Sequence, residues 1–347
     1  MMPIAPDLLL FSRLGLGLMV IVLTLSAGAG GLGLVNLCQR RPFALAAMRV
    51  LAWVVAGMLV AGFLLIGWLN LRIYQRLPLK VPPDLLPWLN QGLAAMNARE
   101  GAGYGLPLLD PAQPPRYILP LWIENGKYYF WFMAYALMIL PAISRPVSHR
   151  LRGALVALLA LQNAILFLLT DPFSRPLPKF FDEIGPWFAG TLDPLGRLGQ
   201  FMRLYPRMLF YYNTPYMWLH PPMLFMSYAA ITVTFVASLF MLAGRGRPEV
   251  EVLGYDYAKF GYFMLTLGML LGYPWALEAW GPNWWWDPKI CSSIMMWAIY
   301  STYLHTRLYA HRKTMWYFTS GLGIVCFAAM IFTFITSFYF PGEHTGQ

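Results

Sequence analysis

The chain has 347 residues, of which 59% are hydrophobic and only 12% are charged. Soluble domains carry about 25% charged residues, so this composition excludes an ordinary soluble protein and predicts an integral membrane protein. The net charge of +10 does not point to nucleic acid, because Lys and Arg in membrane proteins usually mark cytoplasmic loops. The three cysteines form no C-x-x-C pair, which excludes a zinc-knuckle or thioredoxin-like motif within the chain.

Eight apolar segments are long enough to be candidate transmembrane helices, since a bilayer core requires about 20 apolar residues. Helices are expected because backbone polar groups in lipid must be bonded internally, and no segment alternates like a barrel strand. We therefore predict an all-α polytopic membrane helix bundle that forms a single membrane domain over residues 1–347. The predicted spans are 10–36, 45–71, 128–143, 152–170, 219–243, 259–278, 290–309 and 315–339.

The beginning of the chain predicts a retained anchor helix. Its only early basic residue is Arg13, and the apolar run after it continues to about Leu37. A run of that length spans a bilayer, unlike the shorter apolar region of a cleaved signal peptide. The glycines in this run are expected to allow close helix packing. They include Gly28, Gly30, Gly31 and Gly33.

Basic residues lie in four short connections that fall on the same side of an alternating eight-helix bundle. The positive-inside rule places this side in the cytoplasm. Both termini then lie outside, as do loops at 72–127, 171–218 and 279–290. The basic clusters are Arg40, Arg41 and Arg49; Arg145, Arg150 and Arg152; Arg245, Arg247 and Lys259; and Arg307, Arg312 and Lys313.

The two long outer loops are rich in proline and aromatic residues and contain short apolar runs, such as the one from Asp84 to Ala98. Such a run is expected to form a helix at the membrane surface. The loops fit a cap that covers the bundle. They fit equally well a surface that docks a partner or shields a ligand, and the sequence does not separate these alternatives.

The most unusual segment runs from Trp280 to Lys289 and reads Trp-Gly-Pro-Asn-Trp-Trp-Trp-Asp-Pro-Lys. Its Gly-Pro and Asp-Pro dipeptides form turns, so we expect a loop or a short loop helix between two spans. An interfacial aromatic belt explains one or two of these tryptophans. The full cluster favours a platform for a large planar ligand, for which haem is the obvious candidate. The platform residues are Trp280, Trp284, Trp285, Trp286 and Asp287.

Lys289 closes this segment. Its ammonium group fits a counter-charge for a haem propionate, or equally a headgroup anchor at the end of a helix.

Two histidines are expected at the same outer face as the tryptophan loop. His220 opens the span at 219–243, and His344 follows the last span. Two imidazoles beside a tryptophan platform make a natural site for a six-coordinate haem, with one imidazole in each axial position. Either histidine alone also fits an ordinary interfacial residue. The assignment therefore rests on their coincidence with the tryptophan loop.

His305 is placed differently, in the inner half of the membrane. The seventh span begins near Ile290, and 15 residues at about 1.5 Å each put His305 roughly 22 Å deeper. An ionisable residue at that depth is a candidate functional residue, and the alternative is a neutral histidine bonded to a neighbouring helix. The chain has no second intramembrane histidine. If His305 binds haem iron, a second ligand is expected from another subunit.

These segments resemble the haem-handling proteins of cytochrome c biogenesis. The segment from Trp280 to Lys289 resembles their tryptophan-rich "WWD" signature, and His220-Pro-Pro-Met-Leu-Phe-Met-Ser-Tyr228 resembles the segment around their first external histidine. Tyr303-Leu-His-Thr-Arg307 resembles the segment after the signature in the CcsA/ResC branch, and His344 sits where that branch has its second external histidine. The resemblance is close over about 210–347 and general in layout over 1–209.

The resemblance implies one subunit of a cytochrome c synthase, or haem lyase, in a bacterial-type cytoplasmic membrane. His220 and His344 would be the axial ligands of an external, non-covalent haem b on the tryptophan platform. His305 would ligate an intramembrane haem together with a CcsB/ResB-type partner subunit. Haem would enter from the cytoplasmic side and be held reduced at the external site. It would then be presented to an apocytochrome c, whose Cys-x-x-Cys-His thiols add to the haem vinyl groups.

Two positions depart from the family's pattern. Ile290 stands where an acidic residue is usual after Asp-Pro-Lys, and His344 lies in Pro-Gly-Glu-His-Thr-Gly rather than in a Gly-Leu-His-Ser pattern. Two other functions fit part of the sequence. A membrane electron-transfer or quinone-reactive subunit would also hold bis-histidine haem, although such subunits usually place both ligands within spans. A structural subunit of a respiratory assembly would use the tryptophans only as an interfacial belt.

Overall fold

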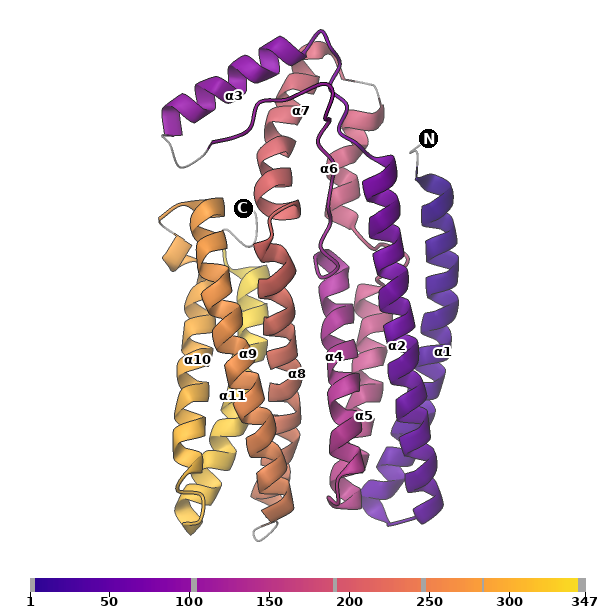
Figure 1. Ribbon diagram of the computed structural model, residues 1–347. Coiled ribbons are helices and arrows are strands. Elements are labelled where there is room, and N and C mark those ends of the chain that lie inside the picture. The colour runs from indigo at the N-terminus through magenta and orange to yellow at the C-terminus, as the bar shows by residue number, and fades with distance from the viewer. Residues whose placement is uncertain (1–3, 101–104, 190–191, 245–247, 283, 343–347) are drawn as a thin grey trace.

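The computed structural model describes residues 4–100, 105–189, 192–244, 248–282 and 284–342. Over these residues the chain is built from helices joined by turns and loops, with one isolated backbone bridge between Pro78 and Arg116. Figure 1 shows a bundle of long, nearly parallel helices with shorter helices at one end. The prediction of an all-α polytopic bundle is confirmed.

Eight long helices correspond one to one to the predicted spans, although α9 begins well before the predicted residue 259. Three of them begin at a proline, Pro42, Pro248 or Pro288, at the first helical position, where a missing N–H removes no helical hydrogen bond. Their bounds are Ala5–Cys38 for α1, Pro42–Arg76 for α2, Glu124–Ser144 for α4, His149–Ile165 for α5, Tyr216–Ala243 for α8, Pro248–Trp280 for α9, Pro288–Arg307 for α10 and Lys313–Tyr339 for α11.

Six of the described helices are long and apolar enough to cross a membrane: α1, α2, α5 with the π-helical turn after it, α8, α9 and α11. Helices α4 and α10 run alongside them (Figure 1) but carry charged residues near their ends, including Glu124, Lys127, Lys289 and Arg307. Long Lys and Arg side chains near helix ends can reach the interface. The helices therefore support a multi-pass membrane protein, and the count of eight crossings stays a prediction.

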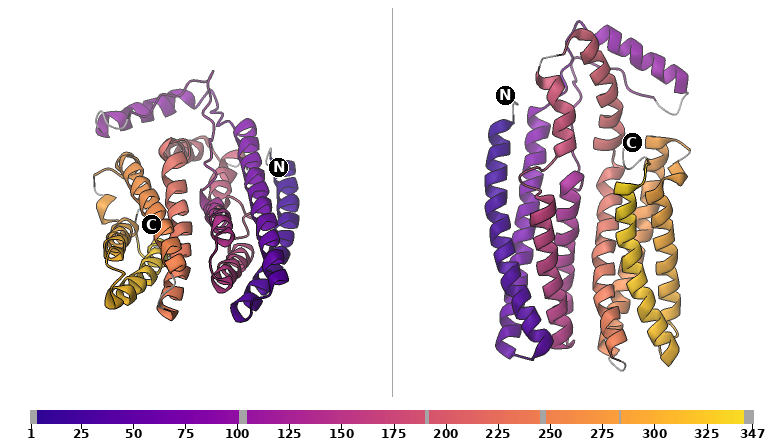
Figure 2. Two further views of the ribbon diagram at one scale, coloured as in Figure 1. Left: turned by 60° about the horizontal axis from the view of Figure 1, so that its bottom comes forward. Right: turned by 180° about the vertical axis from the view of Figure 1, so that it is seen from behind.

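The long helices form two groups, α1, α2, α4 and α5 on one side and α8 to α11 on the other, joined chiefly by α4 against α8 (Figure 2). In the first group, a Cβ added to Gly33 would lie 2.6 Å from the carbonyl oxygen of Gly153. A Cβ added to Gly30 would lie 2.6 Å from the Cβ of Ala160. Only glycine permits this approach of α1 to α5. The predicted packing role therefore holds for Gly30 and Gly33, whereas Gly31 faces open space.

The two ends of the bundle differ in charge. The connections α1–α2, α4–α5, α8–α9 and α10–α11 all lie at the bottom of Figure 1, here called the basic end. These connections carry the predicted basic clusters, of which Arg245 and Arg247 lie outside the described residues. The opposite end, here called the tryptophan end, carries Trp284–Trp286 and both described chain ends. Assignment of the basic end to the cytoplasm remains a prediction.

Three shorter helices lie at or beyond the tryptophan end, within the segments predicted as outer loops (Figure 1). Helix α3 (Leu86–Glu100) confirms the helix expected from the apolar run after Asp84 and packs against α7 (Pro194–Arg207). Helix α6 (Pro178–Ala189) is tied to α7 by an ion pair of 2.6 Å between Glu183 and Arg207. Burial raises the pKa of Glu183, because the loss of hydration outweighs the nearby guanidinium.

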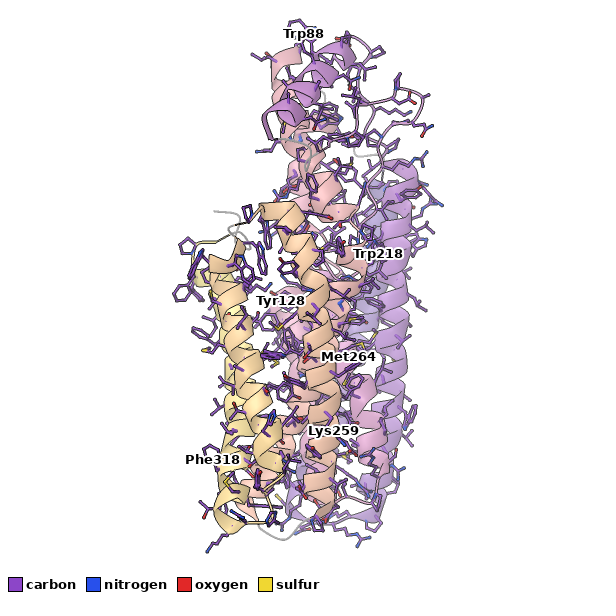
Figure 3. The ribbon with its side chains drawn as sticks, turned by 60° about the vertical axis from the view of Figure 1, so that its left-hand side comes forward. Trp88, Tyr128, Trp218, Lys259, Met264 and Phe318 are labelled. Atoms are coloured by element: carbon purple, nitrogen blue, oxygen red, sulfur yellow. The ribbon has the colours of Figure 1, made fainter. Side chains whose placement is uncertain are left out.

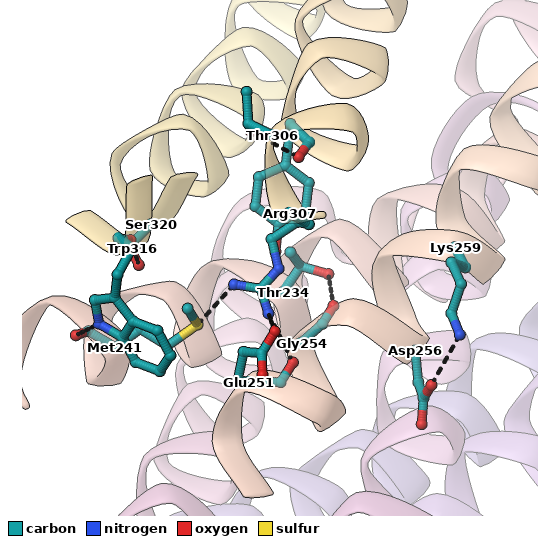
Figure 4. A network of polar contacts seen from close by, with 11 residues as sticks. Thr234, Met241, Glu251, Gly254, Asp256, Lys259, Thr306, Arg307, Trp316 and Ser320 are labelled. Carbon is teal, nitrogen blue, oxygen red and sulfur yellow. Dashed lines mark hydrogen bonds and ion pairs between the residues drawn. The ribbon is translucent and has the colours of Figure 1, made fainter. Parts of the chain in front are cut away.

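A buried arginine fastens α10 to α9 near the basic end (Figure 4). The side chain of Arg307 is only 1% exposed. Its Nη2 donates to the Glu251 carboxylate at 2.8 Å and to the Glu251 carbonyl at 3.0 Å, and Nη1 lies 3.4 Å from the Met241 sulfur. The Trp316 indole donates to the Met241 carbonyl at 2.8 Å. Four helices of the second group therefore meet at this network.

Substitution Glu251→Ala is expected to destabilise the protein strongly, because it leaves the Arg307 charge buried without its anion. We expect the free energy of unfolding, measured by denaturant titration in detergent micelles, to fall by about 3–5 kcal/mol. The control is Asp256→Ala. Its partners Arg145 and Lys259 are exposed, so this loss should stay below about 1 kcal/mol. Equal losses in the two variants would contradict the assigned role of Arg307.

Candidate functional site

His220 lies near the start of α8 and is held against α9. Its Nδ1 lies 2.6 Å from the carbonyl oxygen of Gly268. Because a carbonyl only accepts, Nδ1 carries the ring proton and Nε2 keeps its lone pair. No described residue hydrogen-bonds to Nε2. The backbone of α9 therefore fixes His220 in the tautomer that binds a metal through Nε2.

Gly272 of α9 makes room for this imidazole, and Gly268, one turn earlier, makes room for Leu224. A Cβ added to Gly272 would lie 2.6 Å from the ring atoms Cε1 and Nδ1 of His220, and one added to Gly268 would lie 2.7 Å from Leu224. Trp275 lies nearly parallel to the imidazole, with ring centroids 6.0 Å apart and planes at 27°. The Trp275 indole is itself fixed by donating to the Phe210 carbonyl at 2.8 Å. Three residues of α9, Gly268, Gly272 and Trp275, thus fix the position of the imidazole.

The tryptophan loop joins α9 to α10 as a short loop helix, as predicted. Gly281 has φ of +71°, the left-handed conformation that glycine favours just after a helix. Trp284–Trp286 then form one 3₁₀ turn. The Asp287 carboxylate accepts from the backbone N–H groups of Lys289 at 2.9 Å and Ile290 at 3.3 Å. Asp287 therefore caps α10 and fixes where the loop ends.

The four loop tryptophans divide into different environments rather than forming one flat platform. Trp284 and Trp285 stack with centroids 4.4 Å apart and planes at 20°. Trp280 instead packs at 4.7 Å against Trp275. Trp286 is 82% exposed. Exposure thus increases from the buried Trp284, through Trp285 at 48%, to Trp286, which faces the surroundings of the bundle.

A cavity of about 320 Å³ opens beside these rings and is here called the tryptophan cavity. His220, Trp280 and the stacked pair line it, and Trp286 does not. Part of its rim is formed by Leu270 of α9 and Ile294 of α10, which are 64% and 42% exposed on the outside of the bundle. The cavity combines flat aromatic walls, one imidazole with a free lone pair and an apolar rim.

His305 lies at the opposite end of α10 from the tryptophan loop. The helix ends at Arg307, so His305 stands in its last turn, nearer the basic end than the predicted span implied. Its side chain is exposed, and Nδ1 lies 2.8 Å from the Ser301 carbonyl of the preceding turn. The bond to a neighbouring helix that the alternative required is absent among the described residues. Because α8 begins at the tryptophan end and α10 ends at the basic end (Figure 1), His220 and His305 do not share a site.

The last predicted ligand, His344, lies outside the described residues. The chain just before it does reach the tryptophan loop. A Cβ added to Gly342 would lie 2.7 Å from the Asp287 carboxylate and 2.8 Å from the Pro288 ring. The end of the described chain is therefore packed against the cap of α10.

Sequence reasoning missed the groups that hold His220 in place. Gly268, Gly272 and Trp275 all belong to the apolar run predicted as the sixth span, where they read as ordinary packing residues. Two glycines four residues apart were the available signal, because they mark a helix face where another group comes close. What that group was could not be read from the spacing alone.

Segments of the chain are similar to proteins named cytochrome c biogenesis protein CcsA. A 97-residue segment is 37% identical to that of a Synechococcus strain, covering 27% of this chain and 30% of the relative. The identity is 39% over 83 residues for Cyanidium caldarium, with coverages of 22% and 28%, and 33% over 102 residues for Chlamydomonas reinhardtii, with 26% and 29%. Each match spans less than a third of the relative's length.

The fold is also similar to a solved structure titled "Cytochrome c Heme Lyase CcmF". The TM-score is 0.61 at 18% sequence identity, over 97% of this chain and 48% of the other. At this identity the likeness concerns the fold alone.

A sequence model of the family described as Cytochrome C assembly protein matches residues 124–340. This range begins with α4 and ends just after α11, so it covers more than half of the chain. It contains His220, the tryptophan loop and every helix that lines the tryptophan cavity. The chain therefore belongs to the cytochrome C assembly protein family.

Proposed function

We propose that the chain is the haem-handling subunit of a cytochrome c synthase. It accepts haem through the membrane and presents it at the tryptophan end for thioether attachment to apocytochrome c. The observation that carries this proposal is the meeting of His220 and the stacked Trp284–Trp285 pair in one cavity. That cavity lies within the range matched by the family.

The residues of the tryptophan cavity fit non-covalent haem b. His220 offers a lone pair on Nε2, since the Gly268 carbonyl takes the proton of Nδ1. Flat indoles offer stacking area for a macrocycle, and the apolar rim suits its hydrocarbon edge. We assign axial ligation to His220 and His344. We assign the remaining haem-binding roles to Trp280, Trp284, Trp285, Trp286 and Asp287.

The protein's own residues bind and orient the substrate. Bound haem supplies the vinyl groups to which the cysteine thiols of the apocytochrome add. His220 fixes the iron on one side, while Asp287 acts as a positioning residue because its carboxylate holds the start of α10. Trp286, exposed beside the cavity, is suited to contact the incoming apocytochrome.

A second membrane subunit of the CcsB/ResB type completes the proposed assembly. The support is His305, whose side chain lies exposed on α10 with Nδ1 engaged by the Ser301 carbonyl. A partner helix packed there can bring the second ligand of an intramembrane haem. We place the assembly in a bacterial-type inner membrane with the tryptophan end toward the periplasm. An electron-transfer subunit is not favoured, because His220 lies near the start of α8 and His305 in the last turn of α10, and these helix ends are at opposite ends of the bundle.

Substitution His220→Ala is expected to lower haem content at least about tenfold, because it removes an iron ligand. Maturation of a co-expressed apocytochrome should fall with it. The measurements are pyridine haemochrome analysis of the purified protein and haem staining of the cytochrome. The control is His311→Ala, which changes an exposed histidine in the turn after α10. Normal maturation in the His220→Ala strain would contradict the proposed function.

Substitution Gly272→Ala tests whether the imidazole must sit where it does. The added methyl group would lie 2.6 Å from the His220 ring and should displace it. We expect a shift of the haem absorption away from the low-spin spectrum and about tenfold weaker haem binding. Gly321→Ala in α11 is the matched control, since nothing lies within 4 Å of its added methyl group. If both variants bind haem like the natural protein, the assigned position of His220 is wrong.

A further inference from the structure

A second cavity adjoins the tryptophan cavity and contains two lysines. It has a volume of about 100 Å³ and lies between α4, α8, α9, α10 and α11 at the tryptophan end. Lys127 from the first turn of α4 and Lys289 from the first turn of α10 both line it, so we name it the lysine cavity. Figure 3 shows Tyr128, the neighbour of Lys127, in the half of the bundle near the tryptophan end. The two lysines belong to different helix groups and are far apart in the sequence, and the fold brings them to one cavity.

Neither lysine has an anionic partner among the described residues. The ion pairs of the described chain do not include either ammonium group, so no carboxylate lies within 4.0 Å of them. The Lys127 ammonium lies 5.1 Å from the centroid of the Tyr128 ring. Both side chains are half-buried. Glu124 also lines this cavity, but its carboxylate forms no ion pair with either ammonium group. Two ammonium groups in a cavity lined by one carboxylate favour a ligand that brings further negative charge.

The acidic residues beside these lysines are bonded elsewhere. The two Glu124 oxygens accept from the backbone N–H groups of Lys179 at 2.9 Å and Phe180 at 3.1 Å, so they cap α6. The Asp287 carboxylate likewise caps α10. A carboxylate that caps a helix is held there by charge-assisted hydrogen bonds. Among the described residues, the lining of the lysine cavity therefore carries two ammonium groups and one carboxylate, that of Glu124.

The two cavities share a wall. His220, Leu224, Trp275 and Lys289 line both of them. A flat ligand seated in the tryptophan cavity and bound by His220 thus lies directly beside the lysine cavity. A charged group on its edge can reach Lys289 at the shared wall and Lys127 beyond it. The group on that edge of the ligand must be anionic and small enough to fit a cavity of about 100 Å³.

We infer that Lys127 and Lys289 form a carboxylate-binding site for the propionate groups of the haem that His220 ligates. The inference rests on the proposed function and adds a determinant of orientation to it. With the propionates at the lysine cavity, the opposite edge of the macrocycle, which bears the vinyl groups, faces away from the buried wall. The lysine pair would therefore decide which edge of haem the apocytochrome meets.

The experiment compares haem with its dimethyl ester, in which both propionates are neutral. Each porphyrin is titrated into the apo form of the full-length protein, purified with any co-eluting partner, and binding is followed by absorption. The variants are Lys127→Met and Lys289→Met. Lys259→Met is the control, because Lys259 lies near the basic end (Figure 3) and pairs with Asp256. Size-exclusion elution and thermal unfolding without porphyrin report whether each variant folds.

The natural protein is expected to bind haem at least about tenfold more tightly than the ester, since hydrogen bonds to charged groups are lost with the ester. Each lysine variant should reduce that preference while binding the ester normally. Lys289→Arg, which keeps the charge, should retain part of it. Because neither lysine forms an ion pair with a described residue, the Met variants should unfold no more easily than the natural protein in the absence of porphyrin.

Two other outcomes separate the inference from the proposed function. Haem binding that depends on His220 but shows no preference over the ester, or a preference unchanged in both lysine variants, overturns the lysine site and leaves the function standing. Failure of both porphyrins to bind in a His220-dependent way overturns the proposed function and the lysine site with it.

Discussion

The hydrogen bond from His220 Nδ1 to the Gly268 carbonyl is the contact on which the site depends. It selects the tautomer of the imidazole, and it brings α8 so close to α9 that Gly272 cannot carry a side chain. The close approach places the imidazole on the wall shared by the tryptophan and lysine cavities. This one hydrogen bond between helices, in a low-dielectric setting, therefore determines that Nε2 is the atom free to bind a metal. It also determines where the wall between the two cavities lies.

Two helix starts at the tryptophan end are fixed by carboxylates that cap them. Asp287 holds the start of α10, and Glu124, at the start of α4, holds the start of α6. Each cap fixes a connection that would otherwise have unbonded N–H groups near the membrane surface. Within the described chain, neither Lys127 nor Lys289 has a carboxylate within 4.0 Å. Local helix chemistry and the charge of the cavity are therefore linked, and a change to either cap would alter both.

The sequence was sufficient for the helices and insufficient for the contacts between them. Long apolar runs predict spans because lipid permits few other structures, and the tryptophan loop was placed by its Gly-Pro and Asp-Pro turns. Its division into a stacked Trp284–Trp285 pair and an exposed Trp286 depends on the 3₁₀ turn, which spacing does not specify. Lys127 and Lys289 are far apart in the chain and meet only because α4 packs beside α8. His305 lies in the last turn of α10, which ends at Arg307 rather than at residue 309, and its depth in a membrane stays a prediction.

The apolar rim of the tryptophan cavity has a consequence for how strongly any flat ligand is held. Leu270 and Ile294 are exposed on α9 and α10, so if both helices cross the bilayer as predicted, acyl tails rather than water would border the cavity between them. Lipid tails are as apolar as leucine, so replacing them with a ligand releases little of the free energy that expelling water would provide. A ligand there competes with the bilayer itself. Its residence then depends on iron ligation and on the fluidity of the surrounding membrane, which makes the site suited to release as much as to capture.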